Sequence, residues 1–180
     1  MAGDDRARRD DGFTLIEVMI AMVIIVVGVI ALGTAVATAA RMLTASQDQL
    51  IATQRASEAV ESVFKARDNR ILNWDQIRNV VGAGGDGGIF ADGPQDVRDP
   101  GPDGLVNTAD DGAVENIVKP GPDGLLGTAD DELTPLFGFT REIEIRDIRA
   151  NLRVLRVIIR YRSSTGPAQY VLTTYISSYA

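Results

Sequence analysis

Residues 12–33, GFTLIEVMIAMVIIVVGVIALG, form a long apolar stretch near the amino end of the chain. It is almost wholly apolar apart from Glu17, and no residue from Val18 to Ala40 carries an ionisable side chain. About 20 residues of this kind span roughly 30 Å of hydrocarbon when they form an α-helix. The stretch therefore predicts a single transmembrane helix that begins near Phe13.

A soluble core helix and a secretory signal peptide both fit the apolar stretch less well. A buried helix of a soluble core would need more surrounding protein than one modest domain within 180 residues supplies. A secretory signal peptide would be cut near the Ala-Thr-Ala at residues 37–39. However, the apolar run exceeds the usual length of about 7–15 residues, and the leader before it mixes aspartates with arginines.

Glu17 is the unusual residue of the stretch, because a carboxylate in hydrocarbon costs roughly 2.5–3.5 kcal/mol on insertion scales. A charge at that position is expected to have a cationic partner. If the leader were removed before Phe13, the nearest candidate would be a free amino terminus at Phe13, either its own or that of a neighbouring subunit. The alternative is that the Glu17 side chain extends to the lipid headgroups.

The segment G-F-T-L-I-E at residues 12–17, between a short charged leader and an apolar helix, resembles the class III signal of type IV prepilins and type II secretion pseudopilins. The resemblance implies that a prepilin peptidase cuts between Gly12 and Phe13 and methylates the new amino terminus. It also implies that Glu17 pairs with the amino terminus of a neighbouring subunit during assembly. Glycine at position 12 suits cleavage, because it lets an extended backbone enter a protease site without a clashing side chain.

Composition excludes several classes of protein. The chain has no Cys and no His, which excludes zinc sites of the usual type and catalysis by Cys–His or Ser–His–Asp groups. The net charge is −7, and residues 86–132 hold 12 acids against Arg98 and Lys119. This local acidity disfavours binding to nucleic acid.

Beyond the membrane, small and apolar residues continue at helical spacing and predict an amphipathic helix to about Ala66. Its apolar stripe includes Ala52, Ala56, Ala59 and Val63. A short second helix or turn is expected to follow, with Leu72, Trp74 and Ile77 as buried anchors. From residue 137 the pattern changes to period two, which predicts three strands within 139–148, 153–162 and 169–177.

These patterns predict an α+β fold, in which a long N-terminal helix packs on a small C-terminal antiparallel sheet. This topology agrees with the pilin-like fold that the signal suggests. The expected parts are a cleaved leader at 1–12, a transmembrane or filament-core helix at 13–40, the helices of the head at 41–81, a Gly/Asp-rich loop at 82–136 and the sheet at 137–180.

The central loop contains an internal repeat, PGPDGLVNTADDG at residues 100–112 and PGPDGLLGTADDE at residues 120–132. Pro and Gly predict loops here, without helices or strands. Clustered carboxylates beside Gly-rich turns are also what Ca²⁺ requires, although the EF-hand pattern is absent. The candidate ligands are Asp103, Asn107, Asp110, Asp111, Asp123, Asp130 and Asp131. A solvated acidic loop is the alternative to calcium binding, and a carboxylate-pair enzyme is disfavoured because these loops offer no rigid cleft.

The resemblance implies a non-enzymatic structural subunit, either a minor pilin of a type IV pilus or a minor pseudopilin of type II secretion. The absence of the disulfide found in many pilins favours a pseudopilin or a minor pilin. The expected location is the cytoplasmic (inner) membrane, with one span and an extracytoplasmic head, and the expected partners are prepilin peptidase and other subunits. No cofactor is required, apart from the possible Ca²⁺. The alternative function is a membrane-tethered, Ca²⁺-dependent binding module that does not polymerise.

Overall fold

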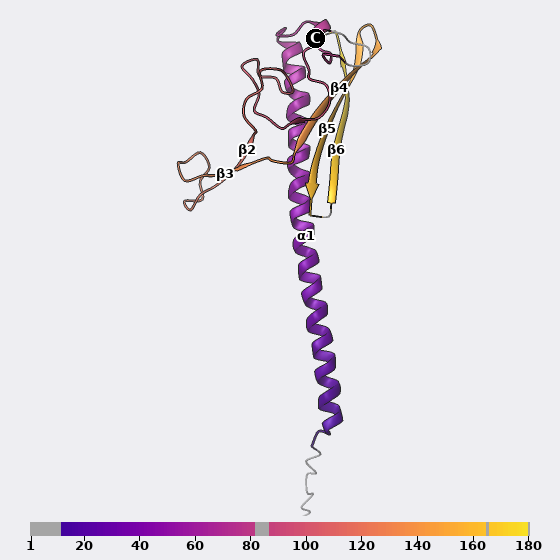
Figure 1. Ribbon diagram of the computed structural model, residues 1–180, viewed down its shortest axis with the longest axis vertical. Coiled ribbons are helices and arrows are strands. Elements are labelled where there is room, and N and C mark those ends of the chain that lie inside the picture. Colours follow the sequence, from indigo (N-terminus) through magenta and orange to yellow (C-terminus); the bar gives the residue numbers. More distant parts are fainter. Residues whose placement is uncertain (1–11, 82–86, 165, 180) are drawn as a thin grey trace, which may run out of the picture. The chain divides into compact units, whose positions relative to one another are not determined.

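The computed structural model describes residues 12–81, 87–164 and 166–179 (Figure 1). The chain divides into two compact units, one up to Met42 and one from Leu43 onward. The predicted leader before Gly12 and the glycine run at 82–85 lie outside the described residues. The first unit is helical throughout from Leu15, and the second unit is the head.

Helix α1 runs from Leu15 to Asp68, two residues beyond the predicted end near Ala66. Gly28 and Gly33 lie within the helix and do not interrupt it. The helix ends where Arg70 adopts a left-handed conformation, with φ of 56°, and the amide of Ile71 donates to the carbonyl of Ala66 at 2.8 Å. These bonds satisfy carbonyls that the helix end would otherwise leave without partners.

The C-terminal segment forms the predicted antiparallel sheet. Strands β4 (Thr140–Arg149), β5 (Leu152–Ser163) and β6 (Gly166–Ser177) are consecutive in the chain, and two residues separate each strand from the next. The short strand β1 (Gln95–Asp96) pairs with β4, so the order across the sheet is β1-β4-β5-β6. The long strands match the segments of alternating polarity, since one face of each strand is apolar.

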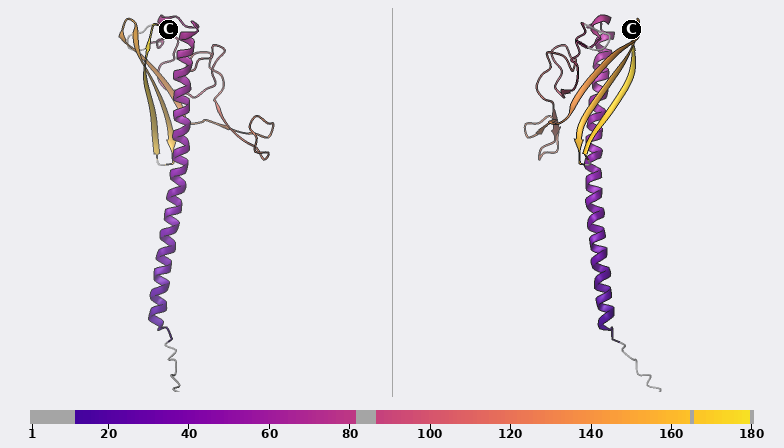
Figure 2. Two further views of the ribbon diagram at one scale, coloured as in Figure 1. Left: turned by 180° about the vertical axis from the view of Figure 1, so that it is seen from behind. Right: turned by 45° about the vertical axis from the view of Figure 1, so that its right-hand side comes forward.

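The core of the head lies between the second half of α1 and one face of this sheet, as two views show (Figure 2). The helix contributes its small-residue stripe, and Ala52, Ala56, Ala59 and Val63 are fully buried. The sheet contributes Leu155, Val157 and Ile159 from β5 and Ile143 from β4, which are also fully buried. Alanine side chains let the helix backbone approach the sheet closely. The predicted α+β fold, a helix packed on a small antiparallel sheet, is confirmed.

The segment 82–136, expected as a Gly/Asp-rich loop with two repeats, also contains short strands. Besides β1, the structure has a hairpin of β2 (Asn116–Lys119) and β3 (Glu132–Pro135), which enclose the second repeat. Residues 117–118 and 133–134, Ile-Val and Leu-Thr, favour extended backbone and pair across the hairpin. Each strand has only four residues, and the Pro/Gly-rich repeat between them dominates the sequence pattern.

The segment after α1 contains a 3-10 helix at Trp74–Gln76, in agreement with the expected short helix or turn. Leu72 and Ile77 are buried as expected, whereas Trp74 is half-buried. Arg153 on β5 holds this turn, because its fully buried guanidinium donates to the carbonyls of Trp74 and Ile77. The same guanidinium lies 4.0 Å from the centroid of the Trp74 ring, and its Nε donates to Asp147 at 2.6 Å. A buried arginine is thus paired with a carboxylate, two carbonyls and an aromatic face.

Candidate functional site

The start of helix α1 is closed by Thr14 and Glu17. The Thr14 backbone amide and hydroxyl each donate to Oε2 of Glu17 at 2.9 Å, and the Glu17 amide donates to the Thr14 hydroxyl at 3.4 Å. This reciprocal pattern is a capping box, with Thr14 as the N-cap and Glu17 three residues later. The sequence reading missed this role, although Thr-x-x-Glu before an apolar run is its usual signal.

The predicted cleavage position lies directly before this cap. Gly12 and Phe13 are exposed, and a side chain added at Gly12 would meet no atom within 4 Å. Nothing in the described fold therefore requires glycine at position 12. The bonds between Thr14 and Glu17 use no atom of residues 1–12, so removal of those residues would leave the cap in place.

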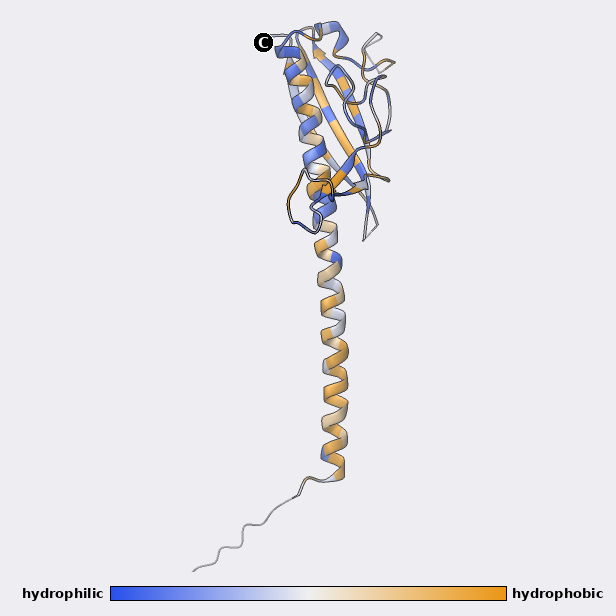
Figure 3. Ribbon diagram, turned by 90° about the vertical axis from the view of Figure 1, so that its left-hand side faces the viewer, coloured by the Kyte–Doolittle hydropathy of each residue, from blue (hydrophilic) through white to orange (hydrophobic). Residues whose placement is uncertain are grey.

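The helix that follows carries an apolar surface around its whole circumference (Figure 3). Large side chains from Phe13 to Val36 are exposed, including Ile16, Ile24 and Ile30 at 61–66%. Among the described residues, one helix is long and apolar enough to cross a membrane, and the apolar window within it is 0% buried. A helix that is apolar on all sides and uncovered requires lipid or other subunits around it.

The first repeat is built into the head. Leu105 is fully buried and Asn107 is 1% exposed. The side chain of Asn107 accepts a hydrogen bond from Nε of Arg141 at 2.7 Å and donates to the Arg141 carbonyl at 2.9 Å. Burial lowers the pKa of the Arg141 guanidinium from its ordinary value, although the carboxylates of Asp111 and Glu115 act in the opposite direction. The first repeat thus satisfies a buried charge on β4.

The carboxylates of both repeats close the turns of their own loops. In the first copy, Oδ2 of Asp111 accepts from the Asn107 amide at 2.8 Å, and Asp110 accepts from the Thr108 hydroxyl at 2.8 Å. The hydroxyl of Thr128 and the amide of Asp123 donate to Asp130 in the second copy, and these bonds lower the pKa of Asp130. Each repeat therefore holds its shape through side chain to backbone bonds.

Several of the predicted calcium ligands already take part in hydrogen bonds within the head. The described residues contain no group of three or more Asp or Glu side chains placed to share a metal ion. Asn107 is engaged by Arg141 on both its oxygen and its nitrogen, which occupies one of the candidate ligands. The carboxylates of Asp103, Asp111 and Asp123 accept backbone amides within their own loops. Calcium binding by the repeats stays a prediction from the sequence.

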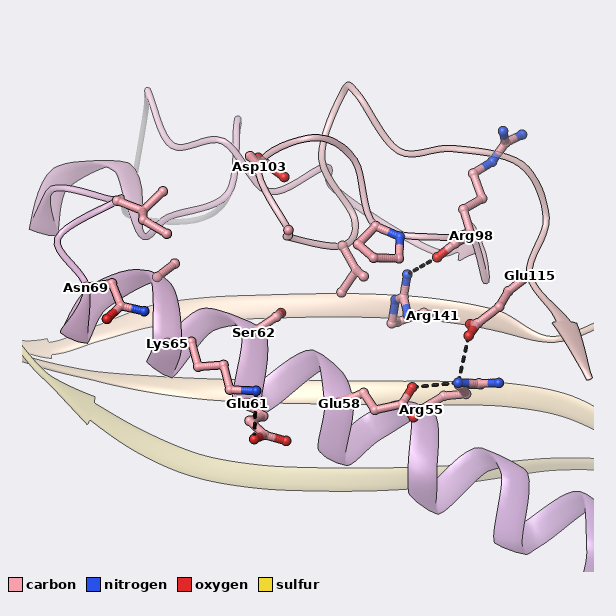
Figure 4. A pocket seen from close by; sticks show the side chains of 15 residues that line it. Arg55, Glu58, Glu61, Ser62, Lys65, Asn69, Arg98, Asp103, Glu115 and Arg141 are labelled. Atoms are coloured by element: carbon pink, nitrogen blue, oxygen red, sulfur yellow. Dashed lines mark hydrogen bonds and ion pairs between the residues drawn. The ribbon is translucent and has the colours of Figure 1, made fainter. Parts of the chain in front are cut away.

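A hollow of about 510 Å³ lies between the second half of α1 and the loop from Arg98 to Glu115 (Figure 4). Several of its charged side chains form ion pairs: Arg55 contacts Glu58 at 2.7 Å and Glu115 at 2.6 Å, and Lys65 contacts Glu61 at 3.0 Å. The hydroxyl of Ser62 donates to a carbonyl of the helix, so it is not paired with a base that would activate it as a nucleophile. The ion pair between Arg55 and Glu115 joins the loop to the helix across this hollow.

We expect Glu115 to make the head less stable as the pH rises. Burial raises the pKa of Glu115 above its ordinary value of 4.5, and the opposing effect of Arg55 is smaller. Between the unfolded pKa and the raised folded pKa, the folded state binds more protons, so the free energy of unfolding falls as pH rises through that window. Denaturant unfolding of the full chain in detergent, followed by Trp74 fluorescence, measures this slope. Glu115→Gln should flatten it relative to the parent, whereas Glu61→Gln, an exposed control, should not; equal slopes in parent and Glu115→Gln would contradict the assignment.

Comparison with known proteins yields one match. Residues 7–37 match the family model described as the prokaryotic N-terminal methylation motif. The chain therefore carries the class III signal of type IV pilins and pseudopilins at its amino end. The match supports a type IV pilin-like or pseudopilin substrate of prepilin peptidase, a class that is structural and not enzymatic in general. No curated protein and no solved structure matches the chain.

Proposed function

We propose that the chain is a filament subunit, a minor pilin or a minor pseudopilin, of a type IV pilus or a type II secretion pseudopilus. Prepilin peptidase cuts between Gly12 and Phe13, the new amino terminus is methylated, and α1 enters the core of the filament. Before assembly the chain is held in the inner membrane by one span, with its head on the extracytoplasmic side. The observation that carries the proposal is the methylation motif at residues 7–37, which includes the first part of the uncovered apolar segment of α1.

The cap at the start of α1 supports the proposed role of Glu17. Thr14 holds the Glu17 carboxylate at the helix start, and residue 13 directly precedes Thr14. Cleavage would create a positive amino group at Phe13, next to this carboxylate. The family resemblance assigns the pairing to the amino terminus of a neighbouring subunit. Such a pair would offset the cost of a carboxylate in hydrocarbon and would exist only after cleavage.

A membrane-tethered calcium-binding module that does not polymerise is the alternative function. It also explains the apolar helix and the acidic repeats, but it gives no reason for the methylation motif. The two functions differ in what happens to residues 1–12, because a simple tether has no need to lose them.

Mass spectrometry of the chain from its native membrane tests the proposal. We expect a mature chain that begins with N-methyl-Phe at residue 13. Gly12→Arg should leave the leader attached and the amino terminus unmethylated, because the larger charged side chain blocks the protease site. The head should be unaffected, since a side chain at Gly12 meets no atom within 4 Å. Cleavage and assembly that both survive Gly12→Arg would contradict the proposed pathway.

A further inference from the structure

The two repeats adopt the same backbone conformation. Gly104 and Gly124 have φ of 73° and 71°, and the next left-handed residues, Asn107 and Gly127, have φ of 60° and 85°. The amides of Leu105 and Leu125 each donate to the aspartate two residues earlier at 2.8 Å. Asp111 and Asp131 accept the equivalent amides of Asn107 and Gly127. The second copy is thus an ordered loop of the same design, held by its own bonds.

The surroundings of the two copies differ sharply. In the first copy Leu105 is 0% exposed and Val106 is 6% exposed, whereas their counterparts Leu125 and Leu126 are 62% and 65% exposed. The second copy stands at the end of the β2–β3 hairpin, which projects from the rest of the head (Figures 1 and 2). The same pair of apolar side chains that fills the core in one copy is therefore presented to the outside in the other.

The exposed pair belongs to a larger apolar surface. Val118 from β2, Leu126 from the loop and Leu133 from β3 line one hollow of about 490 Å³. All three side chains are largely exposed. A contiguous apolar surface on an ordered element indicates an interaction site more strongly than scattered apolar residues do. We call this surface, formed by Val118, Leu126 and Leu133 together with the exposed Leu125 that precedes Leu126 in the chain, the hairpin face.

The place in the head that the first repeat occupies does not suit the second repeat. In that place the side chain of Asn107 accepts a hydrogen bond from the buried Arg141 guanidinium and donates one to the Arg141 carbonyl. The second copy has Gly127 at this position and cannot make either bond. If the second repeat took the place of the first, in the same chain or in a neighbouring copy, the buried Arg141 would lose both of these bonds.

The charge around the hairpin face defines the partner. The hairpin carries Asp123, Asp130, Asp131 and Glu132 against Lys119, so it is net acidic. Two hairpins of this chain would repel each other. The hollow of the head is lined by bases and acids in equal number, and several of them already pair with one another, so it does not select an acidic loop. A protein surface with Lys or Arg around an apolar hollow complements both the leucines and the acids.

We propose that the hairpin face is a docking site for a second protein, whose surface presents an apolar hollow rimmed by Lys and Arg. Leu125 and Leu126 would fill the hollow on the partner, and the acids of the loop would face the Lys and Arg side chains at its rim. Because the loop is already ordered, docking would require little loss of conformational freedom on this side. This proposal goes beyond the filament role, since it concerns the head alone and holds whether or not the amino end is processed.

Photo-crosslinking in native membrane vesicles tests the proposal. The full chain carries p-benzoyl-phenylalanine in place of Leu126, and the control carries it in place of Tyr175, an exposed position on β6 of the same head. We expect the probe at position 126 to form an adduct with one protein, and the crosslinked peptide to contain apolar residues flanked by Lys or Arg. The yield of this adduct from position 175 should be at least about fivefold lower. Higher salt should reduce the yield several-fold, because it screens the charges of the rim.

Several results would overturn the docking site. An adduct to a second copy of this chain would assign the hairpin face to self-association, and an adduct to lipid would assign it to the membrane. A yield at position 126 no higher than at position 175 would mean that the leucines of the hairpin face do not contact the partner. A yield that does not respond to salt would mean that the acids of the loop do not contact a basic rim. Mass spectrometry of the amino terminus in the same samples separates these outcomes from a failure of the filament role, because methylation of Phe13 should be unaffected by the probe.

Discussion

Glu17→Gln is expected to reduce incorporation of the chain into sedimentable filaments by at least about tenfold, while the leader is still removed and the helix still begins at residue 15. Glutamine preserves the cap, because its side-chain oxygen accepts from Thr14 as the carboxylate does. It removes only the negative charge. An amino terminus left without its carboxylate in hydrocarbon costs roughly 3–5 kcal/mol, which is ample for a tenfold effect.

The comparison with Glu17→Ala separates the two roles of this residue. Alanine removes both the charge and the cap, and loss of the cap alone costs about 0.5–2 kcal/mol of helix stability. If the charge is decisive, both variants fail to assemble to a similar extent. If Glu17→Gln assembles normally and only Glu17→Ala fails, Glu17 serves as a helix cap and the proposed pairing with an amino terminus is wrong. Cleavage after Gly12, measured by mass spectrometry, is the control for insertion into the membrane.

The main elements of the fold follow from periodicity. Period two in the last part of the chain predicts β4, β5 and β6, and helical spacing of small residues predicts the buried stripe of α1. These signals are strong because each element is long and has one buried face. The β2–β3 hairpin was missed because its strands are short and exposed, and because the Pro/Gly repeat between them gives a stronger signal of a loop.

The buried arginines were missed although the pattern contained a signal. Arg141 and Arg153 occupy the inner-face positions that precede Ile143 and Leu155, so alternation alone places both of them toward the core. Arg153 has one near partner, Asp147, but its other partners and that of Arg141 lie far away in sequence: the carbonyls of Trp74 and Ile77 for Arg153 and Asn107 for Arg141. A single sequence shows which face a residue takes, but it does not show which distant groups satisfy it there.

The two repeats also look equivalent in sequence and differ only in what surrounds them. The first copy pairs with β4 through Asn107, whereas the second copy has glycine there and stands apart on its hairpin. The repeat therefore predicts two similar loops, and it is the tertiary structure that gives one of them a place in the core.

Leu105→Ala is expected to lower the free energy of unfolding of the head by about 2–5 kcal/mol, because Leu105 is 0% exposed and its removal leaves a cavity. Leu125→Ala, the same substitution at the same position of the second copy, should change it by less than about 0.5 kcal/mol, because Leu125 is 62% exposed. Denaturant unfolding of the full chain in detergent, followed by Trp74 fluorescence, measures both values. The two variants remove the same atoms, and both leucine amides donate to the aspartate two residues earlier, so the difference between them reports mainly burial. A large loss of stability from Leu125→Ala would mean that the second copy is covered within the chain, and it would contradict both this difference and the exposed hairpin face.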